Sequence, residues 1–165
     1  MEPGLLSSDV IALAQRVVDA NRGAGRTVAL AESCTGGLVC SALTEIPGSS
    51  AVLDRGFVTY SNEAKHQVLG VSNDVLDTFG AVSIATVWAM AQGALKHSGA
   101  DVAVAISGIA GPDGGSEQKP VGTVVFARAI RGNDELLAEE RLFPADSRAA
   151  VRHQAVLVAL ELLLP

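Results

Sequence analysis

The spacing of hydrophobic positions along the chain predicts a regular succession of helices and strands. Residues 8–22 place Val10, Leu13 and Val17 on one face at helical spacing, and residues 100–108 form a nearly continuous apolar run typical of a buried strand. The same criteria predict further helices over 35–46, 62–70, 83–99 and 146–164, and further strands over 26–33, 52–61, 122–132 and 134–143. The segment 72–83 holds at most a turn or two of helix. The predicted order is therefore α-β-α-β-α-α-β-β-β-α.

This order combines crossover connections, which favour parallel strands, with a late hairpin around the turn "RGND". We therefore expect an α/β fold, a three-layer α/β/α sandwich around one mixed β-sheet. The 165 residues are expected to form a single domain over 1–165, and the low aromatic content of 4% predicts an aliphatic core. Ligands of such sheets bind beyond the carboxyl ends of the strands. Three polar segments fall at those ends, namely 32–37, 59–65 and 107–120.

Composition and charge exclude several classes of partner. The formal net charge is −6 and the 12 Lys and Arg residues are scattered, which argues against direct nucleic-acid binding. No stretch reaches about eighteen apolar residues and the N-terminus lacks a basic signal region, so we expect no membrane association. Cys34 and Cys40 are expected to be reduced thiols of a cytoplasmic protein. No metal-binding motif is present, and we expect neither a metal nor a cofactor.

The stretch "ESCTGGL" follows a predicted strand and opens a predicted helix. Ser33 and Thr35 are good helix caps, and Gly36 and Gly37 ease a tight turn, so a purely structural role would account for the motif. The same position would place Ser33 or Cys34 as a nucleophile at a helix N-terminus, where free N–H groups stabilise an oxyanion. A serine nucleophile needs a base, and none of the three histidines lies in a predicted strand-end loop.

Two further strand-end segments carry candidate chemistry. In "TYSNEAK", Lys65 would act as a general base if burial lowered its pKa, and Tyr60 would relay a proton or orient a carbonyl. The alternative is a solvated lysine on a short helix capped by Asn62. In the loop "SGIAGPDGGSEQKPVG", glycines let backbone N–H groups approach a ligand, and Lys119 or Arg148 would bind an anion. This loop matches neither a phosphate-binding Walker loop nor a dinucleotide fingerprint.

Four stretches occur in order: "AESCTGGL", "PGSSAVLDRGFVTYSNEAK", "GAVS" and "SGIAGPDGGSEQKPVGTV". Together they closely resemble the C-terminal domain of the CinA family, the competence/damage-inducible proteins. The resemblance runs from about Leu5 to the last helix. Stand-alone members of that family are nicotinamide-nucleotide amidases, and the chain resembles this form rather than members with a larger N-terminal domain. The resemblance therefore implies hydrolysis of the carboxamide of nicotinamide mononucleotide to nicotinate mononucleotide and ammonia.

The family is described as using a serine and a lysine without a metal, and the matching motifs carry these roles onto this sequence. Ser33 is then the nucleophile and Lys65 the base, with Tyr60 assisting. The substrate-binding set that we expect comprises Thr35, Gly36, Gly37, Ser107, Gly108, Gly111 and Arg148. Backbone N–H groups of the turn 34–37 would stabilise the oxyanion. The positively charged pyridinium of the substrate would help to lower the pKa of Lys65.

Two alternatives remain open at this point. A cysteine amidohydrolase would use Cys34 and would be sensitive to iodoacetamide. A non-catalytic nucleotide-binding accessory module, linked to competence or the DNA-damage response, would keep the fold and the pocket without turnover. In either case the partner is a small-molecule nucleotide, and an unpaired strand edge or an apolar helix face leads us to expect a homo-oligomer.

Overall fold

The computed structural model describes residues 4–165, and its helices and strands follow the predicted order. The helices are α1 (Ser8–Gly23), α2 (Leu38–Thr44), α3 (Asn62–Leu69), α4 (Asn73–Phe79), α5 (Ile84–Lys96) and α6 (Arg148–Leu162), with a short 3-10 helix at Ser49–Ala51. The strands are β1 (Val28–Glu32), β2 (Leu53–Val58), β3 (Val102–Gly108), β4 (Thr123–Ile130) and β5 (Asn133–Leu142). Within residues 4–165, no helix has the length and apolarity that a membrane crossing requires.

The strands form one mixed sheet in the order β2-β1-β3-β4-β5. Strand β1 pairs in parallel with both β2 and β3, whereas β4 is antiparallel to β3 and to β5. The parallel strands are joined through helices and the antiparallel pair β4–β5 through a tight turn, as the sequence predicts. Because β1, β2 and β3 run in the same direction, the segments that follow them meet at one edge of the sheet.

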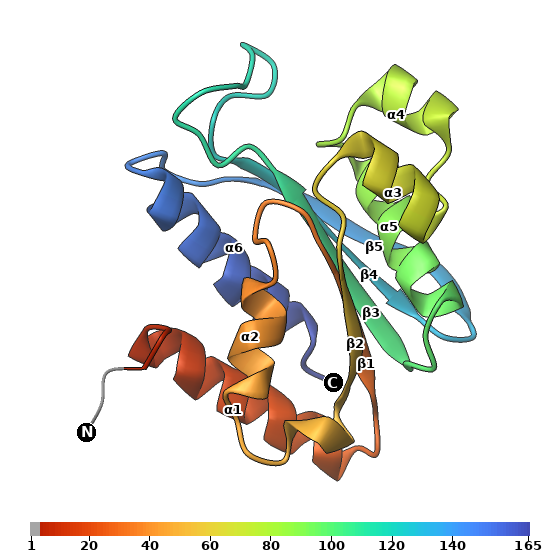
Figure 1. Cartoon of the computed structure of the whole chain (residues 1–165), viewed down its shortest axis with the longest axis vertical. Helices are drawn as coiled ribbons and strands as arrows, with labels where there is room; N and C mark the ends of the chain where they lie inside the picture. The colour runs from red at the N-terminus through yellow and green to blue at the C-terminus, as the bar shows by residue number, and fades with distance from the viewer. Residues whose placement is uncertain (1–3) are drawn as a thin grey trace.

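Helices cover both faces of the sheet, which confirms the predicted α/β/α sandwich (Figure 1). Helices α1, α2 and α6 lie on one face, over side chains such as Leu30 and Ile106. Helices α3, α4 and α5 lie on the other face, over small side chains such as Ala31 and Ala105. Successive residues of a strand point to opposite faces, so each central strand contributes to both apolar layers. The core is aliphatic, as the composition predicts.

A close contact between α3 and α5 fixes the position of α3. Gly93 of α5 lies directly against the carbonyl group of Leu69, the last residue of α3, and a Cβ at this position would clash with it. Glycine is therefore the residue that permits this approach. The contact holds α3 against the sheet, and Lys65, one turn before Leu69, is buried as a result.

Two predicted helix starts are wrong. Helix α3 is capped by Ser61 and not by Asn62, because Ser61 has extended backbone and its Oγ accepts the N–H of Ala64 at 3.0 Å. Helix α2 begins at Leu38 and not at residue 35. Gly36 and Gly37 have φ angles of 57° and 100°, and this left-handed backbone prolongs the turn after β1 before a helix can start.

Candidate active site

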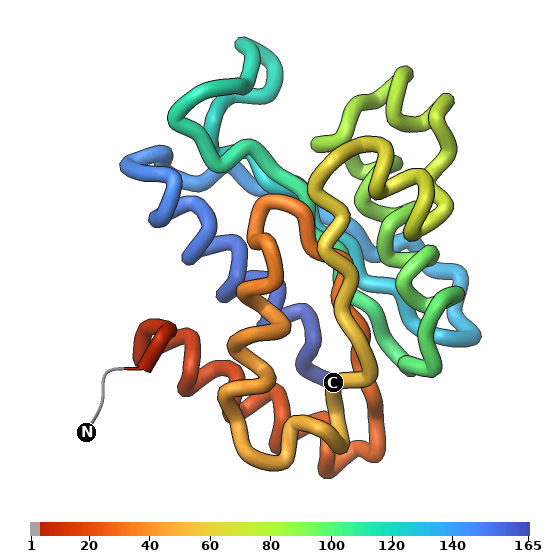
Figure 2. The backbone as a smooth tube through the Cα atoms, viewed as in Figure 1, coloured from red at the N-terminus to blue at the C-terminus, as the bar shows by residue number. Residues whose placement is uncertain are grey.

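A cleft of about 310 Å³ opens at the carboxyl ends of β1, β2 and β3. The segments that follow these strands, together with the first turn of α6, surround it, and the tube drawing places their loops at one end of the molecule (Figure 2). From the predicted site, the cleft brings together Ser33, Tyr60, Lys65, Ser107, Gly108, Gly111 and Arg148. Segments that are far apart in the sequence therefore meet where the strand ends predict a ligand site.

Ser33 and Lys65 are in direct contact at the bottom of this cleft. Ser33 is the first residue after β1. It lies two residues after Ala31, so its side chain points to the same face of the sheet, towards the layer that contains α3. The Nζ atom of Lys65 lies 2.9 Å from Ser33 Oγ. The side chain of Lys65 is 1% exposed and that of Ser33 is 7% exposed. A potential nucleophile is thus paired with a buried amine.

The surroundings of Lys65 favour its neutral form. Burial lowers its pKa from 10.5 to about 8, although the nearby Cys34 thiol opposes this change. Besides Ser33, the amine donates to the carbonyl oxygens of Thr59 at 2.8 Å and Tyr60 at 3.1 Å. A neutral amine has two N–H groups and one lone pair. If the two carbonyls accept the two N–H groups, the lone pair is directed at the Ser33 hydroxyl, as a general base requires.

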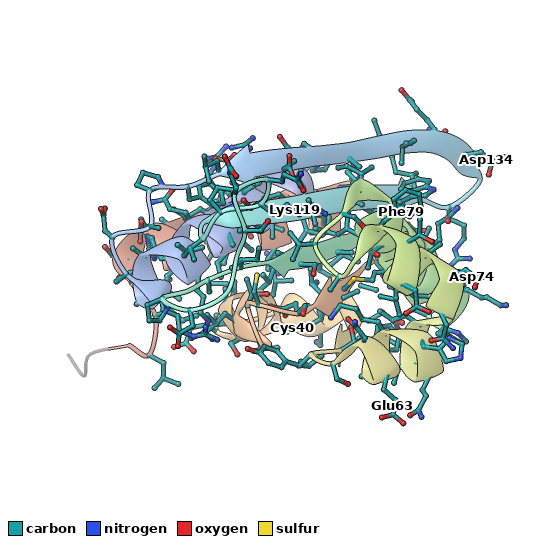
Figure 3. The ribbon with its side chains drawn as sticks, turned by 90° about the horizontal axis from the view of Figure 1, so that it is seen from above. Cys40, Glu63, Asp74, Phe79, Lys119 and Asp134 are labelled. Atoms are coloured by element: carbon teal, nitrogen blue, oxygen red, sulfur yellow. The ribbon has the colours of Figure 1, made fainter. Side chains whose placement is uncertain are left out.

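The turn Ser33–Gly37, which we call the nucleophile turn, is fixed from below by a buried carboxylate. Glu32 is fully buried, and its carboxylate accepts the Thr35 hydroxyl at 2.7 Å and the N–H groups of Val39 and Cys40 at 3.0 and 3.1 Å. Figure 3 labels Cys40 on α2, the helix whose first N–H groups are used in this way. The carboxylate therefore joins the end of β1 to the start of α2.

This arrangement corrects the expected role of Thr35. Its side chain is fully buried and donates to Glu32, so it neither caps α2 nor reaches the cleft. Gly36 and Gly37 also lie outside the cleft lining. The side chain of Thr35 is accordingly part of the support of the turn rather than of a substrate contact.

Glu32→Ala is expected to lower the free energy of unfolding by about 2–4 kcal/mol, because it leaves a buried hydroxyl and two buried N–H groups without an acceptor. Urea unfolding followed by circular dichroism measures this change. The matched control is Glu63→Ala on the exposed surface of α3, for which we expect a change within about 0.5 kcal/mol. Equal stability of the two variants would contradict the role given to Glu32.

Cys34 borders the cleft, but its environment is unfavourable for a thiolate. The side chain is 5% exposed, and burial raises the pKa of its thiol to about 11. Burial also raises the pKa of Cys40, and the carboxylate of Glu32 adds to this effect. Cysteine reactivity requires the thiolate form. The structure therefore favours Ser33 over Cys34 as the nucleophile.

Tyr60 and Arg148 form one wall of the cleft. Arg148 donates to the Tyr60 hydroxyl at 3.1 Å and to the carbonyl oxygen of Gly111 at 2.7 Å. Tyr60 is 63% exposed, and it touches Lys65 through its main-chain carbonyl rather than through its phenol. The phenol is instead held at the mouth of the cleft, close to a guanidinium that retains further N–H donors for an anion.

The long loop between β3 and β4 lines a further part of the cleft. Ser107 is buried at the end of β3 and donates to the carbonyl oxygen of Ala81 at 2.8 Å. Lys119 donates to the carbonyl oxygens of Phe79 and Val82 at 3.2 and 2.5 Å, so it ties this loop to the segment between α4 and α5 (Figure 3). Lys119 does not line the cleft, and two of its three N–H groups are used in this structural contact.

Sequence reasoning missed two residues that shape the site. The first is Glu32, for which the available signal was a carboxylate at the end of an otherwise apolar strand. The second is Arg152, which donates from α6 to the carbonyl oxygens of Cys34 and Thr35. No local pattern marks this second contact, because Cys34 and Thr35 precede Arg152 by 118 and 117 residues in the sequence. Among residues 4–165, no cluster of three or more His, Cys, Asp or Glu side chains is arranged to hold a metal ion.

Comparisons with known proteins give matches over nearly the whole chain. The family model of the CinA C-terminal domain matches residues 10–165. The nicotinamide-nucleotide amidohydrolase PncC of Escherichia coli strain K12 is 53% identical over 159 residues, which cover 96% of this chain and 95% of that protein. The protein of the same name from Enterobacter agglomerans is 57% identical over 137 residues, or 83% of this chain and 82% of that protein. The crystal structure of the competence/damage inducible protein CihA from Agrobacterium tumefaciens has a TM-score of 0.94 and 50% identity, and covers 98% of this chain and 97% of its own.

Proposed function

Because the chain belongs to the CinA C-terminal domain family, we propose that it is a nicotinamide-nucleotide amidohydrolase that converts nicotinamide mononucleotide to nicotinate mononucleotide and ammonia. The family match confirms the resemblance that the four motifs indicated. Relatives at 53–57% identity that carry this name support the reaction. The observation that carries the mechanism is the 2.9 Å contact between Lys65 Nζ and Ser33 Oγ.

The proposed first half-reaction forms an ester on Ser33. Neutral Lys65 accepts the hydroxyl proton as Ser33 Oγ attacks the carboxamide carbon, and the carbonyl oxygen becomes an oxyanion. Backbone N–H groups of the nucleophile turn stabilise that charge. The C–N bond then breaks, Lys65 gives its proton to the leaving nitrogen, and ammonia departs.

The second half-reaction releases the product. Lys65, again neutral, accepts a proton from a water molecule that attacks the ester carbon. The bond to Ser33 Oγ breaks, and Lys65 returns the proton to that oxygen. The product is formed as the carboxylic acid, which loses its proton to solvent or to the released ammonia, so nicotinate mononucleotide leaves as the carboxylate and the enzyme regains its starting state. No step requires a metal ion.

The rest of the nucleotide fits the outer part of the cleft. Arg148 lies at the N-terminus of α6, where both its guanidinium and the helix favour the phosphate. Gly108 and Gly111 border the same region, where backbone is accessible to the ligand. We further propose that residues 1–165 act as one amidase domain, that the protein works in the cytoplasm, and that it forms a homo-oligomer that does not bind nucleic acid directly.

The direct test measures ammonia release from nicotinamide mononucleotide by the purified chain in the presence of a metal chelator. We expect stoichiometric formation of ammonia and nicotinate mononucleotide. Parallel reactions with nicotinamide riboside and free nicotinamide define the substrate range, and we expect slower turnover without the phosphate because Arg148 then has no anion to bind. Binding of the nucleotide without any ammonia release would support the accessory-module alternative instead.

A further inference from the structure

Helix α6 carries two arginines, one turn apart, that reach different parts of the site. Arg148 contacts the cleft wall, as described above. Arg152 does not line the cleft, and it lies instead in a separate cavity between α1 and α6. Its Nε donates to the carbonyl oxygen of Cys34 at 3.0 Å, and its Nη2 lies 3.5 Å from the carbonyl oxygen of Thr35. The planar guanidinium therefore holds successive peptide groups of the nucleophile turn from the face opposite to Lys65.

We propose that Arg152 is a positioning residue that orients the peptide groups of the nucleophile turn so that their N–H groups stabilise the oxyanion. This inference rests on the proposed function, because it assumes that Ser33 is the nucleophile. Arg152 is not itself part of the cleft lining and has no hydrogen bond to Ser33 Oγ, so it acts through the main-chain carbonyls of Cys34 and Thr35.

The geometry of the peptide between Cys34 and Thr35 supports this role. The peptide is trans, so its N–H points away from the carbonyl oxygen that Arg152 holds. Arg152 approaches from α6, and the N–H of Thr35 is consequently directed away from that helix. Within residues 4–165, this N–H donates to no protein acceptor, whereas the N–H of Gly36 is already used by Ser33 O at 3.0 Å. An oriented N–H without a protein acceptor is available to a developing negative charge.

The guanidinium lies close to the turn at Gly36. A Cβ there would be in ordinary contact with Arg152 Nη2 at 3.6 Å, so it is the φ of +57° that favours glycine at this position. An arginine fork reaches two carbonyl oxygens at fixed spacing, which a lysine ammonium cannot reproduce with the same geometry. The support from Arg152 is also distinct from that of Glu32, which acts through the Thr35 side chain and the start of α2.

A merely structural role makes a different prediction. Arg152 also packs beside Leu6, Val10 and Val156 in a shallow cavity between α1 and α6. If packing were its main contribution, replacement would lower stability and leave the chemical step unchanged. If it orients the turn, replacement lowers kcat, while KM and the pH midpoint set by Lys65 change little, because Arg152 has no hydrogen bond to Lys65, Tyr60 or Arg148.

The test compares Arg152→Met and Arg152→Lys with Arg141→Met, an exposed arginine on β5, in the ammonia-release assay. Met retains most of the aliphatic length, and Lys retains the charge. For Arg152→Met we expect kcat to fall about tenfold to a hundredfold, with KM within about threefold and an unchanged pH midpoint. We expect Arg152→Lys to recover part of this loss and Arg141→Met to match wild type. If Arg152→Met does not fold, Arg152→Lys serves as the test instead. A kcat at least about threefold below wild type then supports the proposal, and a kcat equal to wild type overturns it.

The outcomes separate this inference from the proposed function. Wild-type turnover with kcat unchanged in the folded Arg152 variants overturns the role of Arg152 alone. A raised KM with unchanged kcat also overturns it, because that result assigns Arg152 to ground-state binding. Absence of turnover by wild type overturns both proposals together. Full activity of Ser33→Ala overturns Ser33 as the nucleophile, and with it the role of Arg152, but leaves the amidohydrolase activity in place.

Discussion

Ser33→Ala is expected to lower kcat for ammonia release by about 10⁴-fold or more, whereas Cys34→Ala keeps kcat within about tenfold of wild type. The Ser33 hydroxyl is the group that lies 2.9 Å from the buried amine, and without it no ester can form. The Cys34 thiol is buried with a pKa raised to about 11, so it supplies very little thiolate at neutral pH. Steady-state measurement of ammonia with nicotinamide mononucleotide gives both values.

Two controls make this comparison decisive. Urea unfolding shows whether each variant is folded, and iodoacetamide treatment of wild type tests the thiols without any substitution. We expect Ser33→Ala to fold, because the change removes one hydroxyl from a 7% exposed side chain. We also expect iodoacetamide to leave activity largely intact. An inactive Cys34→Ala beside an active Ser33→Ala would reverse the assignment and support the cysteine amidohydrolase.

The fold was largely predictable from the sequence because its signals are local and strong. The apolar run of β3 and the helical spacing of α1 are long enough to exclude other assignments. The crossover rule then places the ends of β1, β2 and β3 at one edge of the sheet, which predicts that the segments containing Ser33 and Lys65 lie near each other. The pairing of these two residues was inferred from the family resemblance, since a lysine on a short helix carries no signal by itself.

The errors fall where side-chain contacts decide the structure. The family resemblance placed Thr35 at the substrate, but the buried carboxylate of Glu32 accepts its hydroxyl and holds that side chain away from the cleft. Lys119 was expected to bind an anion, but it donates two hydrogen bonds to the carbonyl oxygens of Phe79 at the end of α4 and Val82 before α5. The contact from Arg152 depends on how α6 packs against the sheet. The partners of Lys119 and Arg152 lie 37 or more residues away in the sequence, so no local motif reveals them. Glu32, in contrast, is only three residues before Thr35, and its carboxylate at the end of an apolar strand was the one available signal.

These contacts reach the site from the two opposite faces of the sheet. Lys65 reaches Ser33 from the α3 face, where burial controls its protonation. Glu32 and Arg152 support the nucleophile turn from the α2 and α6 face, where they act on its backbone and its Thr35 side chain. The proposed base and the turn that we propose stabilises the oxyanion are therefore held by different faces of the sheet. Substitutions in the two layers should consequently produce different kinetic signatures.

Lys65→Met is expected to lower kcat by about 10³-fold to 10⁴-fold, because Ser33 loses its general base and the leaving nitrogen loses its proton donor. Lys65→Arg should be similarly inactive, since a guanidinium stays protonated. Ammonia release at saturating substrate measures both. Met fills the buried site without a charge, so this variant should remain folded. Activity of either variant within about tenfold of wild type would exclude Lys65 as the base.

The pH dependence of wild type provides the more specific measurement. With a pKa of about 8, roughly one free enzyme molecule in ten carries a neutral Lys65 at pH 7. The value of kcat/KM, which reports the free enzyme, should therefore rise with pH and level off above about 8. The bound pyridinium places a positive charge near the amine and lowers its pKa further, so the midpoint of kcat should lie below that of kcat/KM. Flat profiles between pH 6 and 9 in both wild type and Lys65→Arg would contradict this account.

The stability of the fold also rises with pH, over a higher range, and gives an independent check on the same amine. Below about pH 8 Lys65 is charged in both the folded and the unfolded chain, and its burial costs about 3 kcal/mol, since its pKa falls from 10.5 to about 8. As the pH rises from about 8 towards 10.5, the folded chain loses this proton first, and the stability of wild type increases. Lys65→Met lacks the charge at every pH, although it leaves the carbonyl oxygens of Thr59 and Tyr60 without their donor. The stability advantage of Lys65→Met over wild type should therefore be largest at pH 7 and decrease towards pH 10. The substitution that abolishes catalysis thus removes the energetic cost that the buried base imposes on the fold.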